Sequence, residues 1–288
     1  MKRLAVSCAG LLFSICSSFA ATPPTNQKVQ PAPPPGMVLI PGGTFMMGCT
    51  EEKAECEDIE LPVHEVRIPS YFFDITEVTV EAFEDCLEAG RCGDAITAFD
   101  YDGCNLDPGG NSENGDYPIN CITWQQARDF CRWVGKRLPS EPEWEYAARG
   151  GHKDWKYPWG DKEADCSMAI LCQIQIMEPQ REKCSSKITM GGCGRQRTWP
   201  VKSRLPNDYG LYDMIGNVEE WIQDCWHGDY KKAPSNGKAW TTGDCEVRIR
   251  RGGAWDCREQ RISVFSRAAE DTNGIRPEIG FRCAKSIE

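Results

Sequence analysis

The sequence predicts an α+β fold with little regular secondary structure and many disulfide bonds. Two capping boxes mark the starts of helices, and short stretches of alternating apolar and polar residues mark strands. The 288 residues include 17 cysteines, and the cysteines of an exported chain are expected to pair. We therefore expect short elements joined by long loops, which disulfides and aromatic side chains anchor.

The first 20 residues have the pattern of a secretory signal peptide. Lys2 and Arg3 form a positive start, residues 4–19 are mostly apolar, and residues 18–20 provide small side chains for cleavage. The apolar stretch is too short for a comfortable membrane span. We therefore expect residues 1–20 to be removed, no membrane span or anchor, and a mature protein that is periplasmic or secreted.

Residues 21–36 are predicted to be a proline-rich linker, and residues 37–285 are predicted to form the domain. Proline fixes φ and removes a backbone donor, so the linker is expected to be an extended tether. The net charge of −10 argues against a nucleic-acid partner, because phosphate binding needs a basic surface.

Short strands are expected at the start of the domain. Residues 37–40 and 44–47 are predicted as two strands around the turn at residues 41–43. Residues 63–68 alternate apolar and polar side chains, and residues 71–73 continue as a second buried segment.

Three helices are predicted from their ends. Thr79 can cap a helix that runs to about Ala89, where Gly90 stops it. The other two helices, expected to reach residues 134 and 149, begin at capping boxes. The boxes are Thr123 with Gln126, and Ser140 with Glu143.

Beyond residue 149 the pattern is irregular, with many glycine, proline and aromatic residues. A final strand pair is predicted for residues 247–251 and 280–284.

Seven segments resemble the motifs of the formylglycine-generating enzymes, or sulfatase-modifying factors, in the family's order. They are Met37–Gly48, Glu77–Thr79, Gly135–Arg149, Tyr157–Gly160, Tyr209–Asn217, Arg251–Trp255 and Gly280–Cys283. The resemblance implies the C-type-lectin-like fold of that family, an α+β arrangement with two main helices and small sheets.

The resemblance also implies a chemistry, the oxidation of a cysteine in a client sulfatase to formylglycine by molecular oxygen. In the family two thiolates hold copper(I), an ion that soft sulfur ligands suit. Cys257 stands at the first thiolate position, but Ile262 stands at the second and offers no donor atom. We therefore do not expect copper as a cofactor, and Cys257 is the one family active-site cysteine that the chain retains.

Four more positions of the implied site differ from the family pattern. Ala254 replaces a serine, Arg258 a histidine, Glu219 a tryptophan and Glu278 an asparagine. Together these changes remove a hydroxyl and an amide and bring charges into the site.

These differences predict a domain that has lost the oxidase, because chemistry depends on the site and not on the fold. The family groove is then expected to bind another protein, a peptide or a glycan. The alternative is a formylglycine-generating oxidase with a modified copper site, which needs Cys225 or Cys245 to reach Cys257. A third hypothesis is a thiol-exchange protein built on Cys257.

The resemblance also implies a calcium site. Asp213 and Glu220 can supply carboxylates, and Gly216 and Val218 can supply carbonyl oxygens. Hard oxygen ligands of this kind suit Ca²⁺.

The resemblance implies one disulfide, between Cys131 and Cys283. Nearby positions suggest four others: Cys49–Cys56, Cys86–Cys92, Cys104–Cys121 and Cys225–Cys245. Two more bridges are expected among the four cysteines from 166 to 193.

This scheme leaves Cys257 unpaired, among arginines that would lower the pKa of its thiol. The arginines are Arg250, Arg251, Arg258 and Arg261. A reactive thiol that captures a partner is one reading; the other is a different pairing in which Cys257 belongs to the scaffold.

Overall fold

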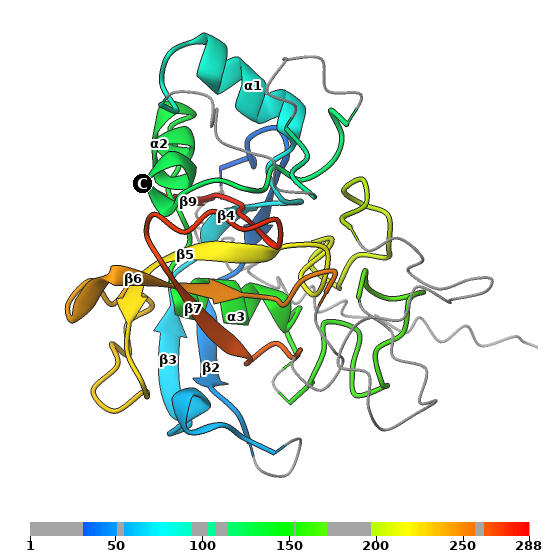
Figure 1. The fold of residues 1–288 in the computed structure, drawn as a ribbon. Helices are drawn as coiled ribbons and strands as arrows, with labels where there is room; N and C mark the ends of the chain where they lie inside the picture. The colour runs from blue at the N-terminus through cyan, green and yellow to red at the C-terminus, as the bar shows by residue number, and fades with distance from the viewer. Residues whose placement is uncertain are drawn as a thin grey trace, which may run out of the picture. The chain divides into compact units, whose positions relative to one another are not determined.

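The computed structural model describes residues 31–50, 55–93, 103–106, 114–152, 154–171, 197–256 and 262–287. The strands in them are β1 (Met37–Ile40), β2 (Gly43–Met47), β3 (His64–Ile68), β4 (Tyr71–Asp74), β5 (Glu219–Trp226), β6 (Asp244–Arg251), β7 (Arg267–Asp271), β8 (Ile279–Gly280) and β9 (Ala284–Ser286). The helices are α1 (Val80–Glu88), α2 (Trp124–Trp133) and α3 (Glu141–Ala148), and Asp58–Glu60 form a 3₁₀ turn. This is the predicted α+β fold with short elements, drawn in Figure 1.

The two strands predicted around the turn at residues 41–43 are confirmed as β1 and β2, but they belong to different sheets. β1 pairs antiparallel with β4, and β2 pairs antiparallel with β3. Gly42 allows this crossing, since a Cβ there would lie 2.8 Å from the carbonyl oxygen of Ile68 and from the amide of Ser70. The turn therefore passes the chain from one sheet to the next.

The three predicted helices are confirmed with their caps. The Thr79 side chain accepts a hydrogen bond from the Ala82 amide, and Gly90 follows α1 with a φ of 65°. Both predicted capping boxes, at the starts of α2 and α3, are present. In Figure 1, α1 and α2 lie side by side, and α3 lies behind β6 and β7 in the middle of the domain.

The predicted strand pair near the C-terminus is wrong in its partners. β6, which contains residues 247–251, pairs with β5 and β7 in a sheet of order β7-β6-β5-β8. Residues 280–284 instead end β8, which runs parallel to β5, and begin β9, which pairs with β4. β5 escaped prediction because its buried face includes Glu219, Glu220 and Asp224, so it has no apolar alternation.

The five predicted disulfides that lie within the described residues are all confirmed. They are Cys49–Cys56, Cys86–Cys92, Cys104–Cys121, Cys131–Cys283 and Cys225–Cys245. Cys166 is also disulfide-bonded. The other three cysteines of the predicted cluster, at positions 172, 184 and 193, lie outside the described residues.

The buried side chains form two clusters, one on each side of β5. One surrounds α3 and the β2–β3 sheet and includes Phe45, Tyr71 and Trp144. The other lies between α1, α2 and β8, where the ring centroids of Phe130 and Phe281 are 5.4 Å apart. Among the described residues, no helix is long and apolar enough to cross a bilayer.

Candidate functional site

A cavity of about 700 Å³ lies beside β6 and β7. Its lining comes mainly from residues 55–60, residues 250–256, residues 262–270 and residues 276–278, together with Glu219 at the start of β5. Residues 250–256 include the Gly-Gly-Ala-Trp motif, residues 252–255. The cavity therefore lies where the resemblance places the active site.

The floor of the cavity is formed by Arg251 and Arg267, which lie in a buried network with Glu141 and Glu145; these four side chains are called the floor network. Arg251 Nη2 lies 2.7 Å from Glu145 Oε2, and Arg267 Nε lies 2.6 Å from Glu141 Oε1. The two carboxylates come from α3, a helix that is buried on nearly every side. Pairing with the arginines allows these acidic side chains to be buried. Burial raises the pKa of Glu145, but Arg149 and Arg251 outweigh it and hold the pKa below its ordinary value.

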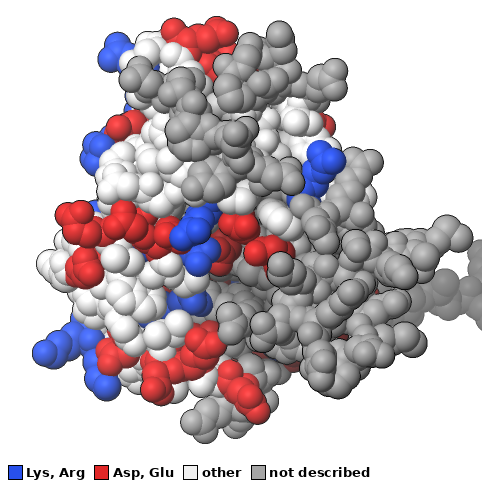
Figure 2. Space-filling view, viewed as in Figure 1, with Lys and Arg blue, Asp and Glu red and all other residues white. Residues whose placement is uncertain are grey.

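The walls of the cavity, which are its lining residues other than the floor arginines, are rich in carboxylates. Figure 2 shows acidic side chains in two bands on the viewed face, with lysine or arginine side chains between them. The carboxylates that line the cavity are Glu55, Glu57, Glu60, Glu219, Asp256, Glu270 and Glu278.

Two of the wall carboxylates form ion pairs with arginines of the described ranges. Glu219 forms a close pair with Arg250, and Glu270 Oε2 lies 3.3 Å from Arg276 Nε. Burial raises the pKa of Glu219 to about 7, although Arg250 opposes this shift.

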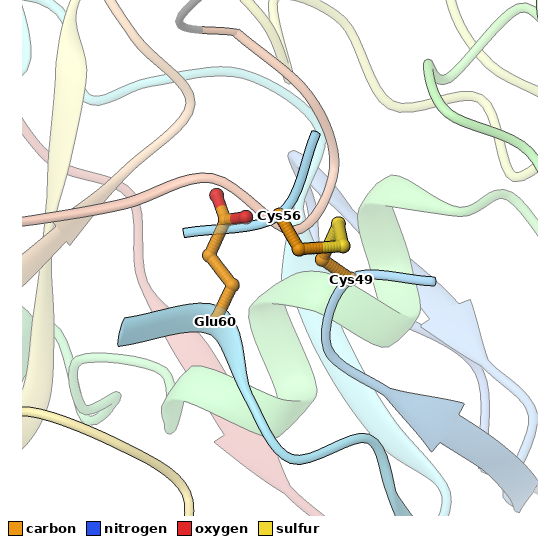
Figure 3. Close-up of side chains that lie close together, drawn as sticks. All are labelled: Cys49, Cys56 and Glu60. Atoms are coloured by element: carbon orange, nitrogen blue, oxygen red, sulfur yellow. A yellow bond between two sulfur atoms is a disulfide. The ribbon is translucent and has the colours of Figure 1, made fainter. Parts of the chain in front are cut away.

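Glu60, at the end of the 3₁₀ turn near the N-terminus of the domain, also lines the cavity and lies next to a disulfide. Figure 3 shows its carboxylate beside the Cys49–Cys56 bridge. Only 5% of the Glu60 residue surface is exposed, and its Oε2 accepts a hydrogen bond of 3.1 Å from the Glu57 amide. Burial raises the pKa of Glu60 to about 7.

Glu278 lines the cavity just before β8 and is half-buried. Its main-chain oxygen accepts a hydrogen bond from the Glu219 amide, which places the residue beside β5. Burial, and then the neighbouring Asp256, raise the pKa of the Glu278 carboxyl.

Cys257, the candidate catalytic residue, lies outside the described residues, as do Arg258 and Arg261. Asp256 and Ile262, the described residues on either side of this gap in the chain, both line the cavity. Ile262 is 1% exposed and belongs to the core cluster around α3, so the second thiolate position is filled by a packed aliphatic side chain.

The surroundings predicted for Cys257 are met only in part. Arg250 and Arg251 are each engaged by a carboxylate, Glu219 and Glu145 respectively. Their charges are therefore already balanced, which weakens the expected lowering of a thiol pKa by these two arginines.

The thiols proposed to complete a modified copper site are bonded to each other. Cys225 and Cys245 form a disulfide between β5 and β6. Every cysteine in the described ranges is disulfide-bonded. Neither Cys225 nor Cys245 therefore provides the free thiol that a modified copper site would need.

The predicted calcium ligands lie in the segment that leads into β5. Asp213 and Gly216 both have positive φ, 54° and 84°, so the backbone curls tightly there. Asp213 Oδ2 accepts a hydrogen bond from the Lys202 amide, and burial raises the pKa of Asp213. Arg282 holds Glu220 in a bidentate ion pair, with Nη2 donating to Oε1 at 2.7 Å and Nε donating to Oε2 at 2.8 Å.

Buried Glu77 adds to this acidic group. Its Oε1 is buried without a hydrogen-bond partner, and its Oε2 receives only a 3.4 Å bond from Asn217. Burial, and then Asp213, raise the pKa of Glu77 well above its ordinary value. An orphaned acidic oxygen beside hard oxygen donors fits a hard cation on the Asp213 side, although Arg282 already occupies the carboxylate of Glu220.

Sequence reasoning missed the floor network and Glu60. Glu141 looked like an ordinary residue of a helix start, since acidic residues are favoured in the first turn, and Glu145, in the next turn, gave no signal of its own. Glu60, with Glu55 and Glu57, is far along the chain from the rest of the cavity lining, and its position depends on long-range packing. The one available signal was the short Cys49–Cys56 loop, which predicts an anchored segment but not what it faces.

Comparison with known proteins gives one domain family for nearly the whole chain. Residues 22–287 match the sulfatase-modifying factor enzyme 1-like domain. The formylglycine-generating enzyme of Thermomonospora curvata is 32% identical, covering 86% of this chain and 93% of the relative. The inactive C-alpha-formylglycine-generating enzyme 2 of Bos taurus is 30% identical, covering 86% of this chain and 87% of the relative.

Two further similarities broaden the range of functions among relatives. The serine/threonine-protein kinase pkn1 of Chlamydia pneumoniae is 33% identical over 91% of this chain, which spans only 40% of that relative's length. Among solved structures, PvdO from Pseudomonas aeruginosa superposes with a TM-score of 0.67 at 27% identity, covering 87% of this chain and 94% of PvdO.

Proposed function

This chain belongs to the sulfatase-modifying factor enzyme 1-like family, and from that membership we propose that it is a non-catalytic recognition module. The module binds a protein or peptide in the cavity beside β6 and β7, which lies at the family's active position.

The observation that carries this proposal is the identity of the side chain at the second thiolate position. Ile262 lines the cavity there and is packed into the core, so it cannot offer a lone pair to a metal. A single thiolate does not provide the pair of soft ligands that copper(I) prefers.

The chemistry of the walls supports the same conclusion. Glu219 and Glu278 line the cavity at positions where the family resemblance implies a tryptophan and an asparagine. Carboxylates are hard donors that favour hard cations and charged ligands over copper(I). The relative named inactive C-alpha-formylglycine-generating enzyme 2, which is 30% identical, is consistent with loss of the reaction in some members of the family.

The test is an aldehyde assay. A capped peptide that carries the cysteine of a sulfatase is incubated with the chain, oxygen and copper(I), and any aldehyde is captured with a hydrazide and identified by mass spectrometry. We expect no aldehyde with or without copper, beside a formylglycine-generating enzyme as positive control. Aldehyde at the peptide cysteine would refute the proposal.

The Ile262→Cys variant is the matched partner in this assay. It restores a thiol at the second position, and we expect it to bind copper(I) more tightly than the wild-type chain in a competition titration with a chromogenic chelator. Equal copper affinity of the two proteins would mean that residue 262 is not the missing ligand.

The second candidate is a formylglycine-generating oxidase, which the likeness to the Thermomonospora curvata enzyme favours. It requires tight copper(I) binding that depends on Cys257. Loss of copper binding in Cys257→Ser, together with aldehyde formation by the wild-type chain, would establish it.

We also propose export to the periplasm or the cell exterior. The five disulfides between described residues favour an oxidising compartment. Fractionation of cells that express the full chain, with the mature N-terminus read by mass spectrometry, tests this proposal and the predicted cleavage near Ala20 together.

A further inference from the structure

Two wall carboxylates, Glu60 and Glu278, have no ion-pair partner among the described residues. Of the other acids in the walls, Glu219 and Glu270 are paired with arginines, and Glu55, Glu57 and Asp256 are exposed to water. Glu60 and Glu278 are therefore the partly or fully desolvated acids of the cavity whose charge the described part of the chain does not neutralise.

Of the two carboxylates, Glu60 carries the larger free-energy cost of burial in its charged form. It is 5% exposed, and among the described residues the one hydrogen bond to its carboxylate comes from the Glu57 amide. Arg251, the cation that lowers the pKa of Glu60, is already held by Glu145 and Glu141 at 2.7 and 3.3 Å. A buried carboxylate without a counter-charge is unfavourable, and such groups gather at sites where a ligand supplies the missing charge.

Glu278 extends the same negative region from a different part of the chain. It is half-buried next to β8, and Asp256 is the neighbouring group that most disfavours its charged form. The cavity therefore has one unpaired acid from the segment that precedes β3 and one from the segment that precedes β8.

The cations of the lining are fewer than its acids. Arg251 and Arg267 pair with Glu145 and Glu141, Arg250 with Glu219, and Arg276 with Glu270. The fifth cation, Lys156, has no ion pair among the described residues, and its Nζ lies 4.8 Å from the centroid of the Tyr157 ring. Among the described residues the lining therefore has seven carboxylates and five cationic side chains, so it carries a net negative charge. Low-dielectric walls focus the resulting field onto a bound ligand.

We propose that the cavity binds its ligand through an ammonium or guanidinium group that ion-pairs with Glu60, with Glu278 as the second anchor. This inference rests on the recognition function proposed above and names its ligand class. A cavity of about 700 Å³ is large enough for a basic side chain with part of its backbone. The cationic group can come from a lysine- or arginine-containing peptide or from a free polyamine.

A proton is expected to leave as the cation binds. Glu60 has a pKa of about 7, so it is about half protonated at neutral pH, and an ammonium group beside it favours the carboxylate. Affinity should therefore rise as the pH increases from about 6 to about 8. The charged groups that face Glu60 are Arg251, Glu57 and Glu145, and those that face Glu278 are Asp256, Arg250, Arg276 and Glu219.

The experiment is calorimetric titration of the full mature chain. The probes are a capped glycine peptide with one arginine and one lysine, its isosteric analogue with citrulline and norleucine, and spermidine. We expect at least one cationic probe to bind, with proton uptake by the buffer, while the neutral analogue does not bind. Glu60→Gln and Glu278→Gln should each weaken binding about tenfold, the effect of losing one charge-assisted contact.

Glu65→Gln is the matched control, because Glu65 is an exposed carboxylate on β3 that does not line the cavity. It should bind as the wild type does. A melting curve for each variant separates lost binding from lost folding, and the two cavity variants change walls that are far apart in sequence, so failure of one to fold leaves the other informative.

The outcomes separate cleanly. Binding of the peptide alone identifies a peptide ligand, and binding of spermidine alone identifies a polyamine. Equal binding of the neutral analogue, or unchanged affinity in both Gln variants, overturns the inference. Since the probes contain no cysteine, aldehyde formation in the earlier assay would refute the recognition proposal without touching this result.

Discussion

The floor and the walls of the cavity are both built from acidic and basic side chains, but they differ in how the acids are balanced. In the floor, Glu141 and Glu145 each meet an arginine within 2.7 Å. In the walls, Glu60 is as buried as a core residue and has no such partner in the described chain. The pKa of Glu145 is accordingly lowered, while that of Glu60 is raised to about 7.

This difference separates structural charges from charges that are available to a ligand. A fully paired buried network specifies how α3 and β6 fit together, and losing one member leaves a bare charge. An unpaired carboxylate makes the folded state less stable than it could be, and proteins accept such a cost mainly at functional positions.

Removal of a floor cation should produce the largest effect. Arg251→Met leaves Glu141 and Glu145 with one arginine fewer in a fully buried site, so we expect the free energy of unfolding to fall by about 3–5 kcal/mol. Urea denaturation at neutral pH measures it. Arg132→Met is the control, because Arg132 is exposed on α2, and it should change stability by less than about 0.5 kcal/mol. Equal losses in both variants would contradict the role given to the floor.

The acids around Asp213 provide a test of intermediate size. If a calcium ion balances Asp213 and Glu77 there, millimolar calcium should stabilise the fold by about 1–3 kcal/mol, and a chelator should reverse the gain. Asp213→Asn should abolish this response, whereas Asp85→Asn, at an exposed position on α1, should keep it. A calcium response that survives Asp213→Asn would place the ion elsewhere.

Substitution of the wall residue Glu60 should have a smaller effect on the free energy of unfolding, and one that depends on pH. Because the pKa of Glu60 is raised in the folded state, its contribution to stability is present below about pH 4.5 and is lost as the pH rises to about 7. Glu60→Gln removes that loss, so the variant should exceed the wild type by on the order of 1 kcal/mol at pH 8 and approach it at pH 5. Parallel stability curves for the two proteins would show that Glu60 is not desolvated in solution.

The smallest effect is expected at Glu278, which is only half-buried. Glu278→Gln should stabilise the chain at pH 8 by a few tenths of a kcal/mol, because water already screens much of the charge. A gain in the free energy of unfolding larger than that of Glu60→Gln would show that Glu278, not Glu60, is the more destabilising carboxylate. The same unfolding curves measure it.

The parts of the fold that depend on neighbouring residues could be predicted from the sequence. The caps at Thr79, Thr123 and Ser140 are formed by side chains within three or four positions, so the helices followed from local chemistry. Four of the five confirmed disulfides join cysteines at most 20 positions apart. Cys131–Cys283, 152 positions apart, came from the family resemblance alone.

The parts that depend on distant partners could not be predicted in this way. β5 has a polar sequence because Glu219 and Glu220 are neutralised by arginines on β6 and beside β9, and no local pattern reports such a partner. For the same reason, the sequence marked Glu219 and Glu278 as unusual but did not join them to Glu60. The cavity brings the three together through long-range packing.

The Cys49–Cys56 bridge has a consequence for binding kinetics and entropy. It ties the segment that carries Glu60 to Cys49, which is fully buried against the core. A receptor group fixed in this way loses little freedom when a ligand arrives, so most of the ordering penalty of association is borne by the ligand. Stiffer ligands should therefore gain affinity through longer residence times rather than through faster encounter.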